Sequence, residues 1–440
     1  MTIRPDPATA SAALYERALK VLPGGCSRNA ILRRPHPLYV ARGEGCYVTD
    51  IEGVRRIDFS NNMGSLIHGH ACAPVMDAVS RQLQLGTAYM MGTEAEILYA
   101  EYLCARVPGY QKVRFVNSGT EAIMCALKAA RAFTGRPMIA KVEGAYHGIY
   151  DFAEVSQTAK PSNWGDIDQP ARVPVAHGTP ASTLGEVVVI PFNDPDRAIA
   201  ILDRYARKVA CVLVDPIPHR VGLMSATPQF VAALSKWTRD NGALLVFDEV
   251  ITFRTTFSGA QGNYDVRPDL TAMGKIIGGG FPTGVLAGRS DVMNVFDPLA
   301  PQVLVPHSGT FSANPVTMVA GRVAMELFDR AAVERLNHLG ELARAQIREA
   351  IRIAGASACV TGAGSMFRIH LKPEPPRNYR EMFMTAAEEN QRQALLNHLV
   401  DHGVLLVDTC SGMLSTPMSE KEIEVLAIAV LGALRLQPFL

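Results

Sequence analysis

The chain has 440 residues, of which 48% are hydrophobic and 19% are charged, and its formal net charge is +1. These values are typical of a soluble α/β protein of about two or three domains, and they provide no electrostatic basis for binding nucleic acid or an anionic membrane surface. The eight cysteines are scattered without a Cys-x-x-Cys pair, which favours reduced thiols in the cytoplasm over disulfides or zinc.

The N-terminal part of the chain predicts a helix and a small hairpin. The helix covers 11–22 and ends at a Pro-Gly-Gly turn, and the hairpin covers 38–48. Residues 1–10 include an aspartate and two prolines and lack the apolar core of a signal peptide. We therefore do not expect a signal peptide at this end of the sequence.

Two histidines, His68 and His70, lie in a predicted loop over 61–70 that is rich in glycine and asparagine. A metal site needs a further ligand at a suitable spacing, and the sequence offers none. A structural role is therefore favoured over a metal site.

From residue 74 onward the chain alternates helices and strands. A short strand at 113–116 runs into Asn117-Ser118-Gly119-Thr120-Glu121, and a helix follows over 122–133. A strand, small residues and a helix N-terminus together form the geometry that binds phosphate groups, because free backbone N–H groups and the helix dipole face the anion. The alternative is that Ser118 or Thr120 simply caps the helix.

The next strand, 138–141, leads to Tyr146 between two glycines. A tyrosine at a strand end can lie flat against a planar ligand, and the alternative is an ordinary buried loop aromatic. The segment 157–185 is long, polar and without periodicity, which is typical of a functional or mobile loop.

Two further strands are predicted at 187–191 and 210–215. His219 and Arg220 follow the second of them, so both lie near the same sheet edge. Either side chain could reach a ligand there, and a solvent-facing Arg220 is equally compatible with the sequence.

The strand 244–248 is an unbroken apolar run that ends in Asp248, as expected for a strand buried on both faces of a parallel sheet. The segment 268–275 repeats this pattern and ends in Lys275, before a glycine-rich loop. An acid and a lysine at neighbouring strand ends suit pyridoxal phosphate. The lysine forms a Schiff base with this cofactor, and the acid keeps the pyridinium nitrogen protonated.

A seventh strand at 285–288 is followed by a loop, by the polar cluster 307–315 and by a helix over 316–328. Helices and short strands follow, and the last helix covers 420–434. The predicted division is an N-terminal segment (1–60) that packs with the small domain, a large cofactor-binding domain (61–315) and a small C-terminal α+β domain (316–440).

Five motifs occur in register with the predicted strand ends: Ser118-Gly119-Thr120, Tyr146-His147-Gly148, Asp248-Glu249-Val250, Lys275 and Gly309-Thr310. Their order and spacing resemble the class III aminotransferases of pyridoxal-phosphate fold type I. The chain is most similar to the branch that contains glutamate-1-semialdehyde aminomutase and the β-amino-acid and D-phenylglycine aminotransferases. A Rossmann dehydrogenase is excluded because no Gly-x-Gly-x-x-Gly follows a strand. The resemblance implies a mostly parallel seven-stranded sheet and a smaller α+β domain.

The resemblance also implies residue roles. Lys275 would hold the cofactor and then move the proton in the reaction, while Asp248 would pair with the ring nitrogen and Tyr146 would stack on the ring. Thr310 would complete the phosphate site of a neighbouring subunit, which implies a homodimer with shared active sites. The expected phosphate-binding residues of the same chain are Ser118, Gly119 and Thr120.

Substrate residues are also implied. Arg28 matches the place where similar β-amino-acid enzymes bind the substrate carboxylate, a task that suits a guanidinium. Ser65 would belong to the pocket walls, with Met63, Leu66 and the 157–185 loop. His219 could reach the substrate or the ring hydroxyl of the cofactor.

Departures from the family pattern concern the substrate side. The chain has Asp215-Pro216 where Glu-Pro is frequent, and Pro218-His219-Arg220 does not match the aminomutase version of this segment. It has Asp408-Thr409-Cys410 where some β-amino-acid enzymes carry a second arginine, which disfavours β-phenylalanine-type substrates. One further departure lies near the phosphate threonine, where Ala313 replaces a usual glycine.

The predicted function is a cytoplasmic, homodimeric aminotransferase with a ping-pong mechanism. The alternatives are an aminomutase, which moves nitrogen within one molecule, and a racemase or epimerase, which yields no keto product. A binding or regulatory protein on the same scaffold is a third alternative, which the presence of both Lys275 and Asp248 disfavours.

Overall fold

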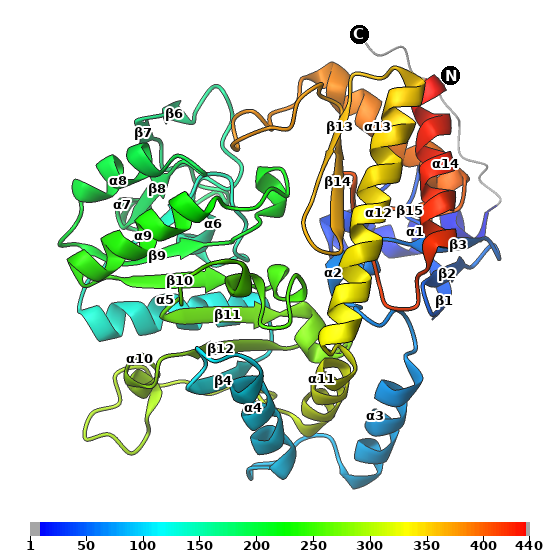
Figure 1. The fold of residues 1–440 in the computed structure, drawn as a ribbon. Helices are drawn as coiled ribbons and strands as arrows, with labels where there is room; N and C mark the ends of the chain where they lie inside the picture. Colours follow the sequence, from blue (N-terminus) through cyan, green and yellow to red (C-terminus); the bar gives the residue numbers. More distant parts are fainter. Residues whose placement is uncertain (1–8, 437–440) are drawn as a thin grey trace.

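The computed structural model describes residues 9–436, and a seven-stranded sheet forms the centre of its larger half (Figure 1). In spatial order the strands are β4 (Lys112–Val116), β12 (Gly284–Gly288), β11 (Leu270–Gly274), β10 (Leu244–Asp248), β9 (Val209–Val214), β5 (Met138–Val142) and β8 (Val187–Ile190). Only β12 runs antiparallel to its neighbours in this sheet. The predicted mostly parallel sheet of seven strands is confirmed.

The sheet is buried on both faces, which explains the unbroken apolar runs in its strands. Along β10, Leu244 and Val246 pack with helix α5 (Gly119–Thr134), while Leu245 and Phe247 pack on the other face. Two helices cover that other face, α8 (Pro195–Asp203) and α9 (Pro228–Asn241). Alternate residues of one strand therefore belong to two separate cores.

The N-terminal and C-terminal parts of the chain fold together into the smaller half. Strand β3 (Arg55–Asp58) pairs in parallel with β15 (Val404–Leu405), about 350 residues later in the chain. The other strands of this half are β1 (Val40–Glu44), β2 (Tyr47–Asp50), β13 (Cys359–Thr361), β14 (Met366–His370) and β16 (Ser411–Met413). Its helices are α1 (Ala10–Leu19), α12 (Arg330–Ala354), α13 (Ala386–Asp401) and α14 (Glu420–Leu436).

Helix α11 (Pro315–Leu327) and a buried arginine connect the two halves. The helix packs against α3 (Ala73–Leu85) and α4 (Glu94–Arg106). Arg254 is fully buried and donates hydrogen bonds to Ser365 Oγ (2.9 Å) and to the carbonyl of Leu414. Burial lowers the pKa of Arg254 to about 9, which leaves the guanidinium charged at neutral pH.

Most predicted elements are present with shifted ends. Helix α5 begins at Gly119, three residues before the predicted start at 122. The segment 157–185 is not wholly irregular, because it contains the ribbon β6–β7 (Gly165–Asp166 and Gln169–Pro170) and α7 (Ala181–Gly185). These pieces are too short to produce a sequence period. Three other short helices are α2 (Asn61–Gly64), α6 (Asp151–Glu154) and α10 (Ser290–Met293).

All eight cysteines are free thiols. Among residues 9–436, no helix is both long enough and apolar enough to cross a membrane. Most of residues 1–10, for which the sequence disfavours a signal peptide, lie outside the described part of the chain.

Candidate active site

A cavity of about 160 Å³ lies at the carboxyl ends of the parallel strands, and we call it the strand-end cavity. This is the edge at which open α/β sheets bind ligands. Its lining comes from five connections that are far apart in sequence: Ser118, Gly119, Thr120, Ile123, Tyr146, His147, Gly148, Asp215, Asp248, Val250, Ile251 and Lys275. Six of the seven residues predicted to bind the cofactor are therefore brought together, all but Thr310.

The turn from β4 into α5 forms one wall of the strand-end cavity. Ser118 is the N-cap of α5, and its Oγ accepts a hydrogen bond from the Glu121 N–H (3.1 Å). Glycines make room beside it, because a Cβ on Gly119 would lie 2.9 Å from the Val250 side chain, and a Cβ on Gly148 would lie 2.4 Å from Thr120 Oγ1. The helix N-terminus thus faces a space that a small anion fits. The cap and the anion cradle are compatible functions of the same turn.

Asp248, at the end of β10, is held by donors. Its Oδ2 accepts a hydrogen bond from His147 Nδ1 (2.7 Å), and its Oδ1 accepts one from the Val250 N–H (3.0 Å). Both donors stabilise a negative charge on Asp248. The His147 ring is buried, and burial lowers its pKa, so the imidazole is neutral with its proton on Nδ1. Its Nε2 has no partner among the described residues.

A second carboxylate lies beside Asp248. Val214 of β9 is in register with Phe247 of β10, so Asp215 and Asp248 end neighbouring strands at the same level. Burial, with the nearby charge of Asp248, raises the pKa of Asp215 well above its usual range. Of the two acids, Asp248 is the one whose carboxylate accepts hydrogen bonds from both a histidine ring and a backbone N–H.

Lys275 follows the last residue of β11 and is half-buried. Its φ of 53° lies in the left-handed region, which costs a non-glycine residue about 1–2 kcal/mol. Such strain is frequent where a side chain must be aimed at a site. Burial lowers the pKa of the Lys275 ammonium, and the charges of Asp248 and Asp215 oppose this shift. The net result is an amine that loses its proton more readily than an ordinary lysine.

Tyr146 lies on the same cavity with two neighbours from the segment after β9. The His219 ring is edge-on to the Tyr146 ring at a centroid distance of 5.9 Å, and the Arg220 guanidinium lies 5.7 Å from the centroid of that ring. His219 itself does not line the strand-end cavity. The sequence therefore placed His219 near the correct sheet edge, but the described contact is with Tyr146.

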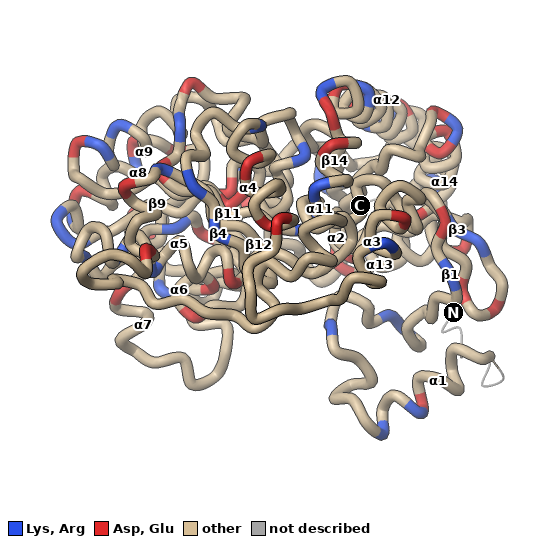
Figure 2. The backbone as a smooth tube through the Cα atoms, turned by 90° about the horizontal axis from the view of Figure 1, so that it is seen from below, with Lys and Arg blue, Asp and Glu red and all other residues tan. Residues whose placement is uncertain are grey.

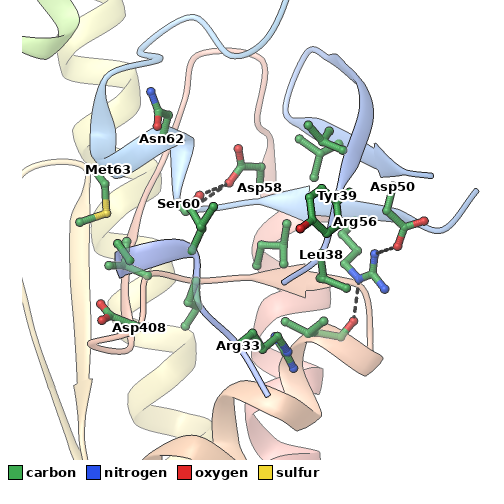
Figure 3. A pocket seen from close by; sticks show the side chains of 18 of the residues that line it. Arg33, Leu38, Tyr39, Asp50, Arg56, Asp58, Ser60, Asn62, Met63 and Asp408 are labelled. Carbon is green, nitrogen blue, oxygen red and sulfur yellow. Dashed lines mark hydrogen bonds and ion pairs between the residues drawn. The ribbon is translucent and has the colours of Figure 1, made fainter. Parts of the chain in front are cut away.

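Arg28 lies in a larger cavity of about 440 Å³, which we call the N-terminal cavity (Figure 3). It is lined by the N-terminal segment, β1–β3 and the region of β15. Asn62, Met63 and Asp408 lie at one end of it, and Arg28 Nη1 donates a hydrogen bond to Asn62 Oδ1 (2.7 Å). Met63 and Val407 belong to the same apolar cluster as Ile251, which lines the strand-end cavity. One apolar cluster therefore contributes side chains to the linings of both cavities.

Ser65 and Thr310 are not brought into the strand-end cavity of their own chain. Ser65 lines a third cavity beside Gly280, and its Oγ donates a hydrogen bond to the Asn62 carbonyl (3.0 Å). Thr310 is exposed. Nearby, Ala313 has a left-handed φ of 58°, which accounts for the usual glycine at this position.

The two loop histidines make structural hydrogen bonds. His68 Nδ1 lies 2.9 Å from Thr416 Oγ1 and its Nε2 lies 2.8 Å from the Ala324 carbonyl, while His70 Nε2 lies 2.8 Å from Asp58 Oδ2. Among residues 9–436, no group of three or more His, Cys, Asp or Glu side chains is placed to hold a metal ion.

Two features were not predicted from the sequence. One is the contact of His147 with Asp248, and the other is that Asp215 and Asp248 end neighbouring strands at the same level. His147 stood beside the predicted Tyr146, but only the tertiary structure shows that its ring reaches another strand end. A signal for Asp215 did exist, because it ends an apolar strand in the same way as Asp248.

We expect that Gly284→Ala destabilises the protein by about 1–3 kcal/mol, because overpacking forces backbone shifts. A Cβ at this position would lie 2.1 Å from the Ser118 carbonyl oxygen, next to the strand-end cavity. Gly185→Ala is the matched control, since its Cβ would meet nothing within 4 Å. Urea unfolding of both variants measures the difference. Equal midpoints would contradict this packing.

The residues of the strand-end cavity fit pyridoxal phosphate. The helix N-terminus suits the phosphate, the Asp248 carboxylate suits the ring nitrogen, and a half-buried lysine of lowered pKa suits the aldehyde. The glycine positions leave room at the point where the cofactor would approach the backbone.

Comparison with known proteins gives a consistent assignment. A family model described as Aminotransferase class-III matches residues 30–418. A glutamate-1-semialdehyde 2,1-aminomutase from Methanothermobacter thermautotrophicus is 40% identical over 367 residues, which cover 83% of this chain and 84% of the relative. Among solved structures, an omega-transaminase from Sphaerobacter thermophilus has a TM-score of 0.95 and 47% identity, with 98% of both chains covered. A transaminase with PLP bound has a TM-score of 0.90 and 42% identity, with 96% of both chains covered. The chain therefore belongs to the class III aminotransferases, a family of pyridoxal-phosphate-dependent enzymes of fold type I.

Proposed function

We propose that this enzyme transfers an amino group from an amine or amino acid to a carbonyl acceptor in two half-reactions. The observation that carries the proposal is the convergence of Lys275, Asp248 and the N-terminus of α5 on one cavity. Pyridoxal phosphate, when bound, supplies a reactive aldehyde and a ring that accepts electrons from the substrate carbon.

Each residue of the strand-end cavity has a distinct task. Lys275 binds the cofactor and then takes and returns the substrate proton at its Nζ, for which a lowered pKa is suitable. Asp248, oriented by His147, holds a proton on the ring nitrogen. Tyr146 covers one face of the ring. The phosphate is bound by Ser118, Gly119 and Thr120.

The active form is a homodimer in which Thr310 reaches the phosphate site of the partner. Two segments, 82–93 and 298–321, contain no Lys, Arg, Asp or Glu. Several of their apolar side chains are exposed, with Met90 at 104%, Leu299 at 91% and Phe311 at 60%. Seen from below, long stretches of the chain nearest the viewer are uncharged (Figure 2). Exposed apolar side chains on both sides of Thr310, within an uncharged segment, support contact with a second copy.

Transamination is favoured over intramolecular amino transfer. The omega-transaminase described above is more similar to this chain than the aminomutase and covers more of it. The segment after β9 also departs from the aminomutase pattern. The aminomutase remains the second candidate function, because relatives with that name match most of the chain. The free thiols favour a reducing compartment such as the cytoplasm.

A single half-reaction distinguishes these functions. The loaded protein is mixed with a donor amine without any acceptor, and the released carbonyl product is measured. A transaminase releases product in an amount equal to that of active sites and then stops. An aminomutase or a racemase releases no keto product, and that result with every active donor would contradict the proposal.

Arg28 in the N-terminal cavity is the proposed binding group for a substrate carboxylate. We expect that Arg28→Met lowers kcat/KM for amino-acid donors by roughly 10- to 100-fold, the size of a lost hydrogen bond to a charged group. Amines without a carboxylate should react as before. Arg42→Met is the matched control, because Arg42 lines the same cavity and its only ion pair within residues 9–436 is with Glu44 at 3.9 Å. An equal loss for both donor classes would contradict this role.

A further inference from the structure

A buried lysine donates hydrogen bonds to the loop that carries Tyr146. We call residues 143–156 the stacking loop. Lys141 is fully buried, and its Nζ donates hydrogen bonds to the carbonyls of Val142 (3.2 Å), Ala145 (3.1 Å) and Val155 (2.9 Å). An ammonium group has three N–H donors, so all three donors of Lys141 are used in hydrogen bonds at the two ends of this loop.

A second cation reaches the same loop from the C-terminal part of the chain. We call residues 376–383, which lie between β14 and α13, the C-terminal strap. In Figure 1 the connection between these elements extends across to the half that contains β6 and β7. Arg380 of the strap donates two hydrogen bonds to the Glu143 carboxylate, from Nε (2.9 Å) and Nη2 (3.0 Å). Only 14% of the Arg380 side chain and 3% of the Glu143 side chain are exposed, so this two-pronged ion pair is shielded from water.

The strap makes further close contacts with the larger half. Arg380 donates to the carbonyls of Gly165 (2.8 Å) and Trp164 (3.0 Å). The Tyr379 ring packs on Gly144, where a Cβ would lie 1.9 Å from Tyr379 Cδ2 and where φ is +75°. The strap therefore contacts the two residues that begin the stacking loop, two and three positions before Tyr146.

The strap also contacts the segment that carries His219 and Arg220. A Cβ on Gly222 would lie 3.2 Å from Pro376 Cγ and 3.3 Å from Met382 Sδ. Both neighbours of the Tyr146 ring thus belong to a segment on which the strap rests.

Glu143 lies between the two cations. Burial lowers the pKa of Lys141 and the Glu143 charge opposes this shift, as Glu154 also does, while Arg220 adds to the lowering. The carboxylate of Glu143 therefore helps to keep the Lys141 ammonium protonated. Arg380 fixes the position of the Glu143 carboxylate, and this carboxylate acts on Lys141. Through Lys141, the effect of Arg380 extends to both ends of the stacking loop.

We propose that Arg380 is a positioning residue through which the C-terminal part of the chain sets the place of Tyr146 in the strand-end cavity. This inference rests on the stacking role proposed above for Tyr146. Arg380 does not line the cavity, and it acts through Glu143 and Gly144.

The test compares Arg380→Met with Arg377→Met in the full-length protein. Arg377 lies on the same strap, but it is exposed and pairs with Glu381 of the strap itself. We expect Arg380→Met to weaken pyridoxal phosphate binding by about tenfold or more, the size of effect that the loss of a coupled charged pair implies. We also expect it to accelerate amide hydrogen exchange over 143–156. Arg377→Met should change neither quantity. Arg380→Lys keeps the positive charge but loses the planar guanidinium that donates two hydrogen bonds to Glu143. The affinity of this variant for pyridoxal phosphate should lie between those of Arg380→Met and wild type.

A double-mutant cycle with Glu143→Gln separates positioning from general loss of stability. The two changes should be non-additive in cofactor affinity, because each one breaks the same contact. Unchanged exchange over 143–156 in Arg380→Met, or full additivity, would overturn the inference. Tyr146→Ala tests the underlying role separately. If it leaves cofactor affinity unchanged, the stacking proposal fails, whereas faster exchange in Arg380→Met still shows that the strap orders the loop.

Discussion

Replacing Lys275 with alanine is expected to lower kcat by roughly 10²- to 10⁴-fold, the usual contribution of a positioned acid–base group. The loss follows from the place of Lys275, which is the only lysine lining the described strand-end cavity. No other side chain there has an amine that can both bind the cofactor and move a proton at the substrate carbon. Steady-state kinetics with a saturating donor and acceptor measure the change.

Lys112→Ala is the control for this substitution. Lys112 lies on β4 of the same sheet, and its exposed Nζ donates to Asn294 Oδ1 (2.7 Å), away from the strand-end cavity. Because burial lowers the pKa of Lys275, wild-type activity should rise with pH through a pKa below that of an ordinary lysine. This rise of activity with pH should be absent in Lys275→Ala. If the variant kept the same rise, another group would have to transfer the proton.

Asp248→Asn is expected to lower kcat/KM by roughly 100-fold or more, a loss typical of a removed electrostatic group in an active site. An amide keeps the shape of the side chain but carries no charge to hold a proton on the ring nitrogen. It also weakens the hydrogen bond that His147 Nδ1 now makes to a carboxylate (2.7 Å). The phosphate-binding turn is untouched, so cofactor affinity should fall less than kcat/KM.

Asp215→Asn is the matched control, since Asp215 ends the neighbouring strand at the same level. Burial, with the nearby charge of Asp248, raises the pKa of Asp215 well above the usual range, so an amide at this position removes a charge that the site already disfavours. The loss in kcat/KM should therefore be far smaller than for Asp248→Asn. Similar losses in both variants would show that the two carboxylates share the charge, contrary to the roles proposed here.

Much of the fold follows from local patterns. Strands such as 244–248 are apolar at every position because helices cover both faces of the sheet, and such runs are visible in the sequence. Strand ends in a parallel sheet meet at one edge, so Asp248 and Lys275 could be placed together without knowledge of the strand order. The helix after 116 was predicted to begin at 122, because Ser118 and Gly119 resemble loop residues until their N-cap geometry is known.

The remainder depends on contacts between distant parts of the chain. The pairing of β3 with β15 and the contact between Arg380 and Glu143 join residues that are hundreds of positions apart, and no local period encodes them. Arg28 and Ser65 were assigned to the substrate side from a resemblance alone. In the structure they line other cavities than the one that contains Lys275, and their roles remain predictions. Thr310 is exposed in its own chain, so the role proposed for it at a phosphate site requires a second copy of the chain.

The central claim is that Lys275 binds pyridoxal phosphate in the strand-end cavity. The most direct measurement is reduction of the loaded protein with borohydride, followed by digestion and mass spectrometry of the peptides. We expect the mass of the reduced cofactor on the peptide that contains Lys275, and on no other lysine peptide. Attachment to a different lysine, or no attachment in protein that retains its visible cofactor absorbance, would contradict the assignment of this site.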